Sequence, residues 1–482
     1  MRSRSLVTAA VLLGGVAAVL IVQTAVGSVS AAAAPSPDDG NGRSVVVQRG
    51  GHDATVPFTA GRGGEVELDV SAAAPDADWS RKGDESAVVS VYADGKYATD
   101  IVIPFAQPIV RHLVLGTLRP GLHLLRLHFA GDRSAAGAHL AVLSGFHFVT
   151  YTARDAGYLT AKFTPVLYGR NLAEFGGPLD NAYSDTPLVA WHEATPAATP
   201  GHTNLQYSII WSNEDGGTNT PQLMARWGRS TDIEWIYRVE IDQNGNRVPG
   251  SDTYQAANHV TTYFHGAYEN DHAVLDTCTS NNNICDTVND PMRFFLSAQE
   301  TLPAGQPREH IMDTNPWTYQ VMAAEMTREG KIEAPPDPST PLVSDQRNYL
   351  YLVVKKDTVP PGNPGPNWVG MAVGVQLKSG ATIYRSDHFG TGGLPDWSLQ
   401  RDDPAATTVE LPAGTTSADI AQVFVYRVVN GAPDPGYSVH VTGVTRGFFL
   451  GSNYLPQQSF LTWQGSVTLT AAAPSAVLWP AS

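Results

Sequence analysis

Acidic residues stand at two places where a β-strand is expected to end or begin. Glu214 follows the strand-like run 205–211, and Asp232 and Glu234 open a second run of strand composition. Glycoside hydrolysis uses one protonated acid and one ionised carboxylate on opposite sides of the scissile bond. If the two strands are neighbours, one carboxylate from each faces a common cleft. We therefore predict Glu214, Asp232 and Glu234 as catalytic residues, the alternative being turn acids and an arginine-neutralised Glu234.

A second concentration of chemically capable side chains is the run 258–272, which contains three histidines and two tyrosines. Alternation along a strand would place His259 and Tyr263 on one face, with His265 following in the same parity. We predict His259 and Tyr263 as catalytic residues. Two chemistries stay open beside hydrolysis: lyase chemistry, in which His or Tyr takes the α-proton of a uronate, and a divalent metal site. Hydrogen-bonded structural His and Tyr side chains are the alternative.

Side chains near these acids can bind a sugar. Tryptophan rings supply flat surfaces on which a sugar ring stacks, and cationic or imidazole groups bind polar substituents. The predicted substrate-binding residues are Trp211, Trp227, Arg238 and His265.

The polar segment 276–290 contains both cysteines of the chain, Cys278 and Cys285. Two nearby cysteines in an exported protein favour a disulfide, which would close a short Asn-rich loop. Asp276, Asn281–Asn283, Asp286 and Asp290 offer oxygen atoms of the kind that calcium binds, so calcium is a candidate cofactor. No HExxH spacing is present, and the metal ligands stay unassigned.

Other function classes are disfavoured. The sequence lacks a G-x-S-x-G elbow, a P-loop and a dinucleotide fingerprint in a strand-to-helix context, which excludes serine esterase, kinase and dehydrogenase interpretations. The net charge of −15 disfavours a general electrostatic grip on nucleic acid or anionic lipid.

Composition indicates the fold class. Only 16% of the 482 residues are charged, while 45 are Gly and 34 are Pro, which favours a turn-rich β architecture over long surface helices. We predict a mainly β, multidomain antiparallel β-sandwich architecture with few short helices. The expected organisation is a secretory signal (1–34), a flexible tail (35–43), an N-terminal β-sandwich module (44–150), a central β-rich domain that carries the site (151–332), a Pro-rich linker (333–341) and a C-terminal β domain (342–482).

Turn dipeptides locate individual elements. Asp94-Gly95 predicts a hairpin between the runs 88–93 and 96–103, and Pro120-Gly121 predicts a second hairpin between 113–118 and 122–129. The best helix candidate is 316–329, with Asn315 as its cap and Gly330 as its stop.

In outline, the segments Val89-Ser-Val-Tyr-Ala-Asp-Gly-Lys and Leu118-Arg-Pro-Gly-Leu-His resemble the accessory β-sandwich modules of secreted carbohydrate-active proteins. The leader and the Ala/Gly/Pro-rich style resemble exported β-rich proteins of high-GC Gram-positive bacteria. The first resemblance covers about a fifth of the chain and implies carbohydrate as a partner.

These patterns together predict a secreted, extracellular protein that recognises or cleaves a polysaccharide, with a glycan as partner and no nucleic acid. The competing classes are a non-catalytic cell-surface or interaction protein, and a metal-dependent hydrolase or polysaccharide lyase that uses the same histidines. An open groove shared by Glu214, Glu234 and an Arg or His would favour an enzyme.

Export is the first testable prediction. Arg2 and Arg4 precede an uncharged apolar run to Gly27, and small residues follow, which is the layout of a cleaved secretory signal. N-terminal sequencing of protein from the medium should find a first residue between Ser28 and Pro35, with no membrane association after cleavage. Recovery of chains that retain Met1 in a membrane fraction would instead indicate an uncleaved anchor.

Overall fold

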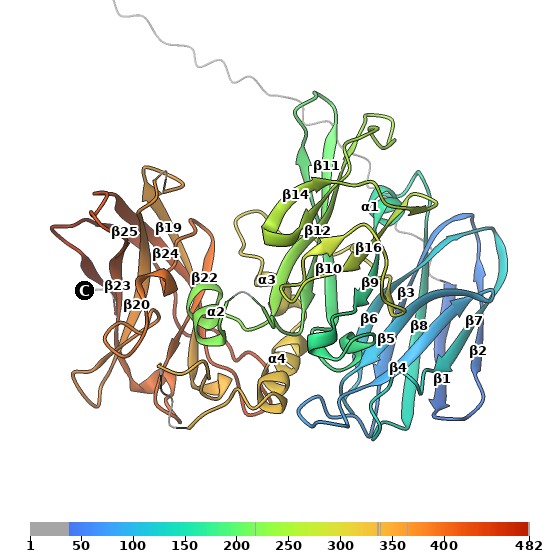
Figure 1. The fold of residues 1–482 in the computed structure, drawn as a ribbon, viewed down its shortest axis with the longest axis horizontal. Coiled ribbons are helices and arrows are strands. Elements are labelled where there is room, and N and C mark those ends of the chain that lie inside the picture. The colour runs from blue at the N-terminus through green and yellow to red at the C-terminus, as the bar shows by residue number, and fades with distance from the viewer. Residues whose placement is uncertain (1–37, 217, 335–336, 338, 364, 481–482) are drawn as a thin grey trace, which may run out of the picture. The chain divides into compact units, whose positions relative to one another are not determined.

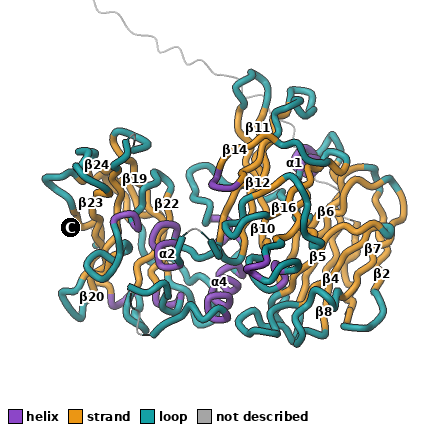
Figure 2. The backbone as a smooth tube through the Cα atoms, viewed as in Figure 1, coloured by secondary structure: helices purple, strands orange, loops and turns teal. Residues whose placement is uncertain are grey.

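Strands are the main regular structure in the computed structural model, with short helices between them (Figure 1, Figure 2). The structure describes residues 38–480 except 217, 335–336, 338 and 364. The predicted secretory signal and the start of the predicted tail lie outside the described residues. The mainly β class with antiparallel sheets is confirmed. None of the helices in the described ranges is long and apolar enough to cross a membrane.

Two four-stranded sheets form the N-terminal sandwich. In spatial order, the first contains β1 (Asp38–Gln48), β8 (Leu140–Tyr151), β3 (Gly64–Ala73) and β6 (Ile109–Leu118). The second contains β2 (Ala54–Ala60), β7 (Gly121–Phe129), β4 (Ala87–Ala93) and β5 (Lys96–Ile103).

The first predicted hairpin is present as β4 and β5, with left-handed backbone at Asp94 and Gly95. The second hairpin prediction was wrong. Strand β6 pairs with β3, whereas β7 pairs with β2 and β4 of the other sheet. The Pro120-Gly121 turn therefore carries the chain from one layer to the other. A two-residue turn signal specifies a tight reversal, but the sheet in which each strand finds its partners is decided by long-range pairing.

The central region has two further sheets. One is ordered β10 (Pro187–Pro196), β11 (Thr203–Trp211), β12 (Asp232–Ile241), β13 (Thr253–Ala256) and β14 (Val260–Tyr263). The other is ordered β15 (Tyr268–Glu269), β16 (His272–Thr277), β9 (Val166–Arg170) and β18 (Arg293–Phe294), with β17 (Ile284–Cys285) paired to β16. Strands β16 and β9 are parallel, unlike the antiparallel pairs around them.

The C-terminal region is a second sandwich. Its sheets are ordered β22 (Ala405–Glu410), β19 (Tyr349–Val359), β24 (Ser438–Phe448), β25 (Trp463–Leu469), and β21 (Ile383–Arg385), β20 (Trp368–Leu377), β23 (Ile420–Asn430), β26 (Ser475–Trp479). Most of its buried apolar residues form a hydrophobic cluster of their own, whereas the N-terminal and central strands share one cluster that also includes Tyr349, Tyr351, Phe448 and Leu450 of the C-terminal region. The exact domain boundaries remain predictions.

The described helices are α1 (Tyr158–Phe163), α2 (Thr220–Trp227), α3 (His310–Thr314) and α4 (Trp317–Arg328), with single 3₁₀ turns at η1 (Ala173–Phe175), η2 (Asp180–Ala182), η3 (Ala257–His259), η4 (Gln346–Asn348), η5 (Pro395–Trp397) and η6 (Ser417–Asp419). Helix α4 lies within the predicted helix 316–329 and the left-handed Gly330 follows its end, but Pro316 and not Asn315 is at the N-cap, and no side chain caps the helix. The fully buried Glu325 of α4 accepts hydrogen bonds from Trp79 Nε1 and Ser184 Oγ, both at 2.9 Å. This carboxylate therefore ties α4 to the N-terminal sandwich and to the segment before β10.

A buried arginine holds the ends of several central elements together. Arg170, at the end of β9, is fully buried, and its guanidinium lies 2.5 Å from Asp180, 2.8 Å from Asp185 and 2.8 Å from Asp215. These aspartates come from η2, the approach to β10 and the loop after β11. Burial raises the pKa of Asp180 to about 6, against the lowering effect of Arg170. The cluster depends on its cation, because removing Arg170 leaves carboxylates buried without a counter-charge.

We predict that Arg170→Met lowers the free energy of unfolding by about 3–5 kcal/mol, the usual cost of removing one member of a buried ionic cluster. Urea unfolding at neutral pH measures this change. The matched control is Arg62→Met, since Arg62 is 45% exposed and pairs with Asp155 at 3.3 Å on the surface. The control should change stability by less than about 1 kcal/mol. Equal, small effects in both variants would contradict the role assigned to the cluster.

Candidate functional site

A polar pocket of about 700 Å³ opens beside the carboxyl-terminal end of β11 and the start of β12. It is lined by residues of the central sheet, of α2, of the segment before α3 and of the segment before β22. Three acids predicted from the sequence, Glu214, Asp232 and Glu234, line this pocket together with His259 and Trp227.

Strand register explains why these acids meet. Strands β11 and β12 are antiparallel neighbours, with Trp211 opposite Asp232 and Ile209 opposite Glu234. Glu214 lies three residues beyond Trp211, in the loop that leaves β11. The end of β11 and the start of β12 lie at the same end of the sheet, so the loop residue Glu214 lies in one pocket with the two acids of β12. The expected strand pairing is therefore present, while the catalytic roles stay predictions.

The pocket acids are largely removed from water. Glu214 and Glu234 are each 9% exposed and Asp232 is 2% exposed. Burial, reinforced by the Asp232 charge, raises the pKa of Glu214 to about 8. Burial and the charge of Glu234 raise the pKa of Asp232 to about 8, and burial raises that of Glu234 to about 7. Each acid therefore ionises in the range where acid and base catalysts work at neutral pH.

Amide groups hold Glu234 and His259. Gln255 Nε2 donates to Glu234 Oε2 and lies 2.7 Å from His259 Nδ1, while His259 Nδ1 lies 3.4 Å from Glu234 Oε1. The Gln255 hydrogen bond favours the ionised form of Glu234 and opposes part of the burial effect on its pKa. Burial lowers the pKa of His259, so the imidazole is mainly neutral at pH 7.

The Asn-rich loop closes the other side of the pocket. In the amide orientation that satisfies both neighbours, Asn281 donates to Glu214 Oε1 over 2.8 Å and accepts from His259 Nε2 over 3.2 Å. The buried Asn282 donates to Asp232 Oδ2 over 3.1 Å and to Asp185 Oδ1 over 3.2 Å. The Cys278–Cys285 disulfide, predicted from the sequence, is present and spans this loop. The loop thus holds two of the three pocket acids through neutral amides.

Four arginines that the sequence did not identify as site residues line the pocket: Arg226, Arg229, Arg308 and Arg401. Arg229 and Arg401 lie 3.2 and 3.3 Å from the buried Glu309, and they lower its pKa against the effect of burial. Among the described residues, Arg226 and Arg308 have no carboxylate within ion-pair distance. Arg401 is far along the chain from the central motifs, so no local pattern indicates it.

Helix α2 places Trp227 and Arg226 at the pocket. Asn219 caps the helix by accepting from Gln222 N, and Gly228 ends it in the left-handed conformation. Two hydroxyls of β22 hold the carboxyl end of α2: Thr407 Oγ1 donates to Ala225 O over 2.6 Å and Thr408 Oγ1 to Met224 O over 2.8 Å. The C-terminal sandwich therefore fixes one wall of the pocket.

Four other predicted site residues lie outside the lining of this pocket, and their roles stay predictions. Trp211 is fully buried in the hydrophobic core and does not line the pocket. Arg238 contacts Gln206 and lies over the Trp235 ring. Tyr263 is 63% exposed and the exposed His265 follows β14, away from the pocket lining. The alternation argument does not apply to His259, because residues 257–259 form a 3₁₀ turn with left-handed backbone before β14 begins.

The described residues offer no set of ligands for the calcium ion considered from the sequence. Within the described ranges, no group of three or more His, Cys, Asp or Glu side chains is arranged to hold a metal ion. Asn281 and Asn282 face protein groups, as described above, and the Asp242 carboxylate accepts the backbone N–H groups of Asn244 and Asn246 within a turn.

Comparison with known proteins gives only partial similarity. No family model and no curated protein matches the chain. A carbohydrate-binding module of a xylanase from the hindgut metagenome of Trinervitermes trinervoides is 12% identical with a TM-score of 0.17, and the match covers 23% of this chain and 99% of that one. A family 35 carbohydrate binding module from an environmental isolate is 13% identical with a TM-score of 0.15, and the match covers 21% of this chain and 72% of that module. A family two carbohydrate esterase from Clostridium thermocellum is 15% identical with a TM-score of 0.15, and the match covers 28% of this chain and 33% of that enzyme. We base no functional argument on these similarities.

We predict that the double variant Cys278→Ser/Cys285→Ser loses about 2–3 kcal/mol of stability, the value expected for cross-linking so short a loop. The loss is measured from the midpoints of urea unfolding, compared at the same m value. Wild-type protein with its disulfide reduced should have the same midpoint as the double variant. Because Asn281 and Asn282 lie within the loop, ligand binding at the pocket should weaken as well. An unchanged midpoint in both samples would show that the bridge is dispensable.

Proposed function

We propose that this protein is an exported enzyme that cleaves an extracellular glycan by acid and base catalysis in the pocket of Glu214, Asp232 and Glu234. One observation carries the proposal: three carboxylates with raised pKa values line one open pocket together with an indole ring and arginines. Protonated and ionised carboxyl groups side by side are what glycoside hydrolysis requires.

In this proposal Glu214 is the general acid and Glu234 the base. Glu234 has the lowest raised pKa of the three acids, about 7, so it ionises first. Glu214, with a pKa of about 8, keeps its proton over the same range. Glu214 gives that proton to the departing glycosidic oxygen as the C–O bond breaks. Glu234 takes a proton from the water whose oxygen bonds to the sugar carbon. One proton is given and one is taken, so the net reaction is hydrolysis of the glycosidic bond.

The remaining groups set the protonation states and bind substrate. Asp232 is the most buried of the three, and its charge disfavours ionisation of Glu214. Asn281 links Glu214 to His259, which couples the acid to the imidazole. Trp227 offers a partly exposed ring at the pocket wall, and sugar rings stack on such faces.

A lyase is the second candidate, favoured by Arg226 and Arg308. Both line the pocket without a carboxylate partner among the described residues, so they are available to bind a uronate carboxylate. The neutral His259 would then take the α-proton as the glycosidic C–O bond breaks and a carbon–carbon double bond forms, and the protonated Glu214 would give its proton to the departing oxygen. Ultraviolet absorption of an unsaturated uronate product separates this outcome from hydrolysis, which yields none.

The central prediction concerns Glu234. Glu234→Gln should keep the fold and lower kcat by roughly 10²–10⁴-fold on a cleaved polysaccharide, because an amide cannot accept the proton from water. The matched control is Glu240→Gln on the same strand, where Glu240 pairs with His202 outside the pocket. The rates come from reducing-end release over a polysaccharide panel, with thermal unfolding of each variant alongside. If neither variant loses activity, or if the panel shows binding without cleavage, the protein is not the hydrolase proposed.

The pH dependence is a further prediction. Activity requires ionised Glu234 and protonated Glu214, so kcat/KM should rise as pH increases through about 7 and fall as it increases through about 8. Asn281→Ala should shift the pH at which activity falls on the alkaline side, because it removes a hydrogen bond to Glu214, whose pKa sets that limb of the profile. Initial rates in buffers of constant ionic strength give the profile. A maximum near about pH 5, with little activity at neutrality, would contradict these acid and base assignments.

A further inference from the structure

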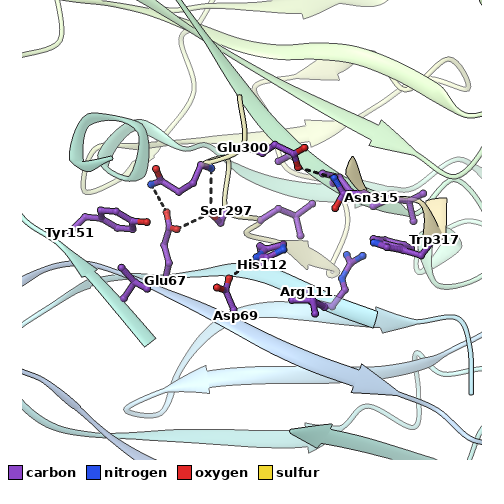
Figure 3. A pocket seen from close by; sticks show the side chains of 16 residues that line it. Glu67, Asp69, Arg111, His112, Tyr151, Ser297, Glu300, Asn315 and Trp317 are labelled. Atoms are coloured by element: carbon purple, nitrogen blue, oxygen red, sulfur yellow. Dashed lines mark hydrogen bonds and ion pairs between the residues drawn. The ribbon is translucent and has the colours of Figure 1, made fainter. Parts of the chain in front are cut away.

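A second cavity, of about 350 Å³, lies between the N-terminal sandwich and the central region (Figure 3). Its lining comes from β3, β6 and β8 on one side, and from β10, the segment 296–300 and the residues around the start of α4 on the other. It shares no lining residue with the pocket of Glu214.

Arg111 of β6 is an unusual feature of this cavity. Its side chain is only 3% exposed and lies in the cavity between His112 and Trp317 (Figure 3). Nη2 donates to Pro187 O over 3.2 Å, and the guanidinium lies 5.2 Å from the centre of a Trp317 ring. Nε is buried and has no hydrogen-bond partner. A buried guanidinium without a counter-charge is costly, by several kcal/mol, unless an anion joins it.

The acids that line the cavity are engaged with other partners. Asp69 lies 2.6 Å from His112 Nδ1 and 3.4 Å from His147 Nδ1. Glu67 accepts from Ser297 Oγ over 2.8 Å and from Gln299 Nε2 over 3.0 Å, and burial raises its pKa to about 7. Glu300 accepts from Asn315 Nδ2 over 2.8 Å.

None of these carboxylates lies within ion-pair distance of Arg111, so within the described part of the chain the guanidinium has no anionic partner. Burial lowers the pKa of Arg111 to about 10, and the group therefore keeps its positive charge at neutral pH. The cavity thus holds one uncompensated cation among carboxylates that are already hydrogen-bonded.

We propose that this cavity binds a sugar acid, with the ligand carboxylate on Arg111 and its hydroxyl groups against the Asp69–His112 and Glu300–Asn315 pairs. A guanidinium fork binds a carboxylate through two parallel hydrogen bonds. The neighbouring carboxylates and the Asn315 amide oxygen can accept hydrogen bonds from hydroxyls, since Asn315 Nδ2 already donates to Glu300 and to Ile311 O, and the His112 imidazole can donate. The volume accommodates one monosaccharide unit. This site does not depend on the function proposed for the Glu214 pocket.

Isothermal titration of the full chain with D-glucuronate, and with D-glucose as the neutral control of similar ring size, tests the proposal. Glucuronate should bind at least about tenfold more tightly than glucose, the difference expected for one charge-assisted hydrogen-bond pair. Arg111→Met should abolish this preference, whereas Arg81→Met, at an arginine 69% exposed on the surface, should keep it. The double variant Arg226→Met/Arg308→Met should also keep it, which separates this cavity from the first pocket, where these two arginines are the candidate carboxylate binders.

Arg111→Lys is the second variant if the methionine variant does not fold, because it keeps a cation and loses the fork. It should reduce the preference for glucuronate without removing it. Binding of glucuronate that is no tighter than that of glucose would overturn the proposal. A preference that survives unchanged in both Arg111 variants would overturn it as well.

Discussion

The ion cluster of Arg170 is the constraint on which the candidate site depends. A fully buried guanidinium lies within 2.8 Å of three aspartates, which come from η2, from the segment before β10 and from the loop after β11. Asp215 is the chain neighbour of Glu214, and Asp185 accepts from Asn282, which also donates to Asp232. The Arg170 cluster therefore helps to position two pocket acids. Glu214 is held through its chain neighbour Asp215, and Asp232 is held through Asn282, which donates to both Asp185 and Asp232.

The pocket differs from the cluster in how its carboxylates are held. Arginines lower the pKa of the buried Glu309, so this acid stays ionised and structural. Glu214, Asp232 and Glu234 are held mainly by the amides of Asn281, Asn282 and Gln255, which supply hydrogen bonds without charge. Burial then raises their pKa values toward neutrality. Two kinds of buried acid thus lie close together, one suited to holding structure and the other to exchanging protons.

Local pattern predicted much of this arrangement. Strand composition located these acids at strand ends, and Glu214, Asp232 and Glu234 come together because β11 and β12 are antiparallel neighbours, the condition on which the expectation depended. The helix α4 and the hairpin of β4 and β5 followed from helix-stop and turn residues. Long-range pairing was not readable: the Pro120-Gly121 turn joins two sheets, and Arg401 reaches the pocket from the C-terminal region. The expected alternation does not extend to His259, because a 3₁₀ turn precedes β14, and Tyr263 and His265 lie outside the pocket lining.

The most direct test of the central claim is a ¹³C NMR titration of the side-chain carboxyl carbons in the mature protein, assigned with Glu214→Gln, Asp232→Asn and Glu234→Gln. The account predicts that Glu234 titrates near pH 7 and that Glu214 and Asp232 titrate near pH 8. Titration of all three pocket acids near the ordinary value of about 4 would contradict the account, because no protonated acid would then remain at neutral pH.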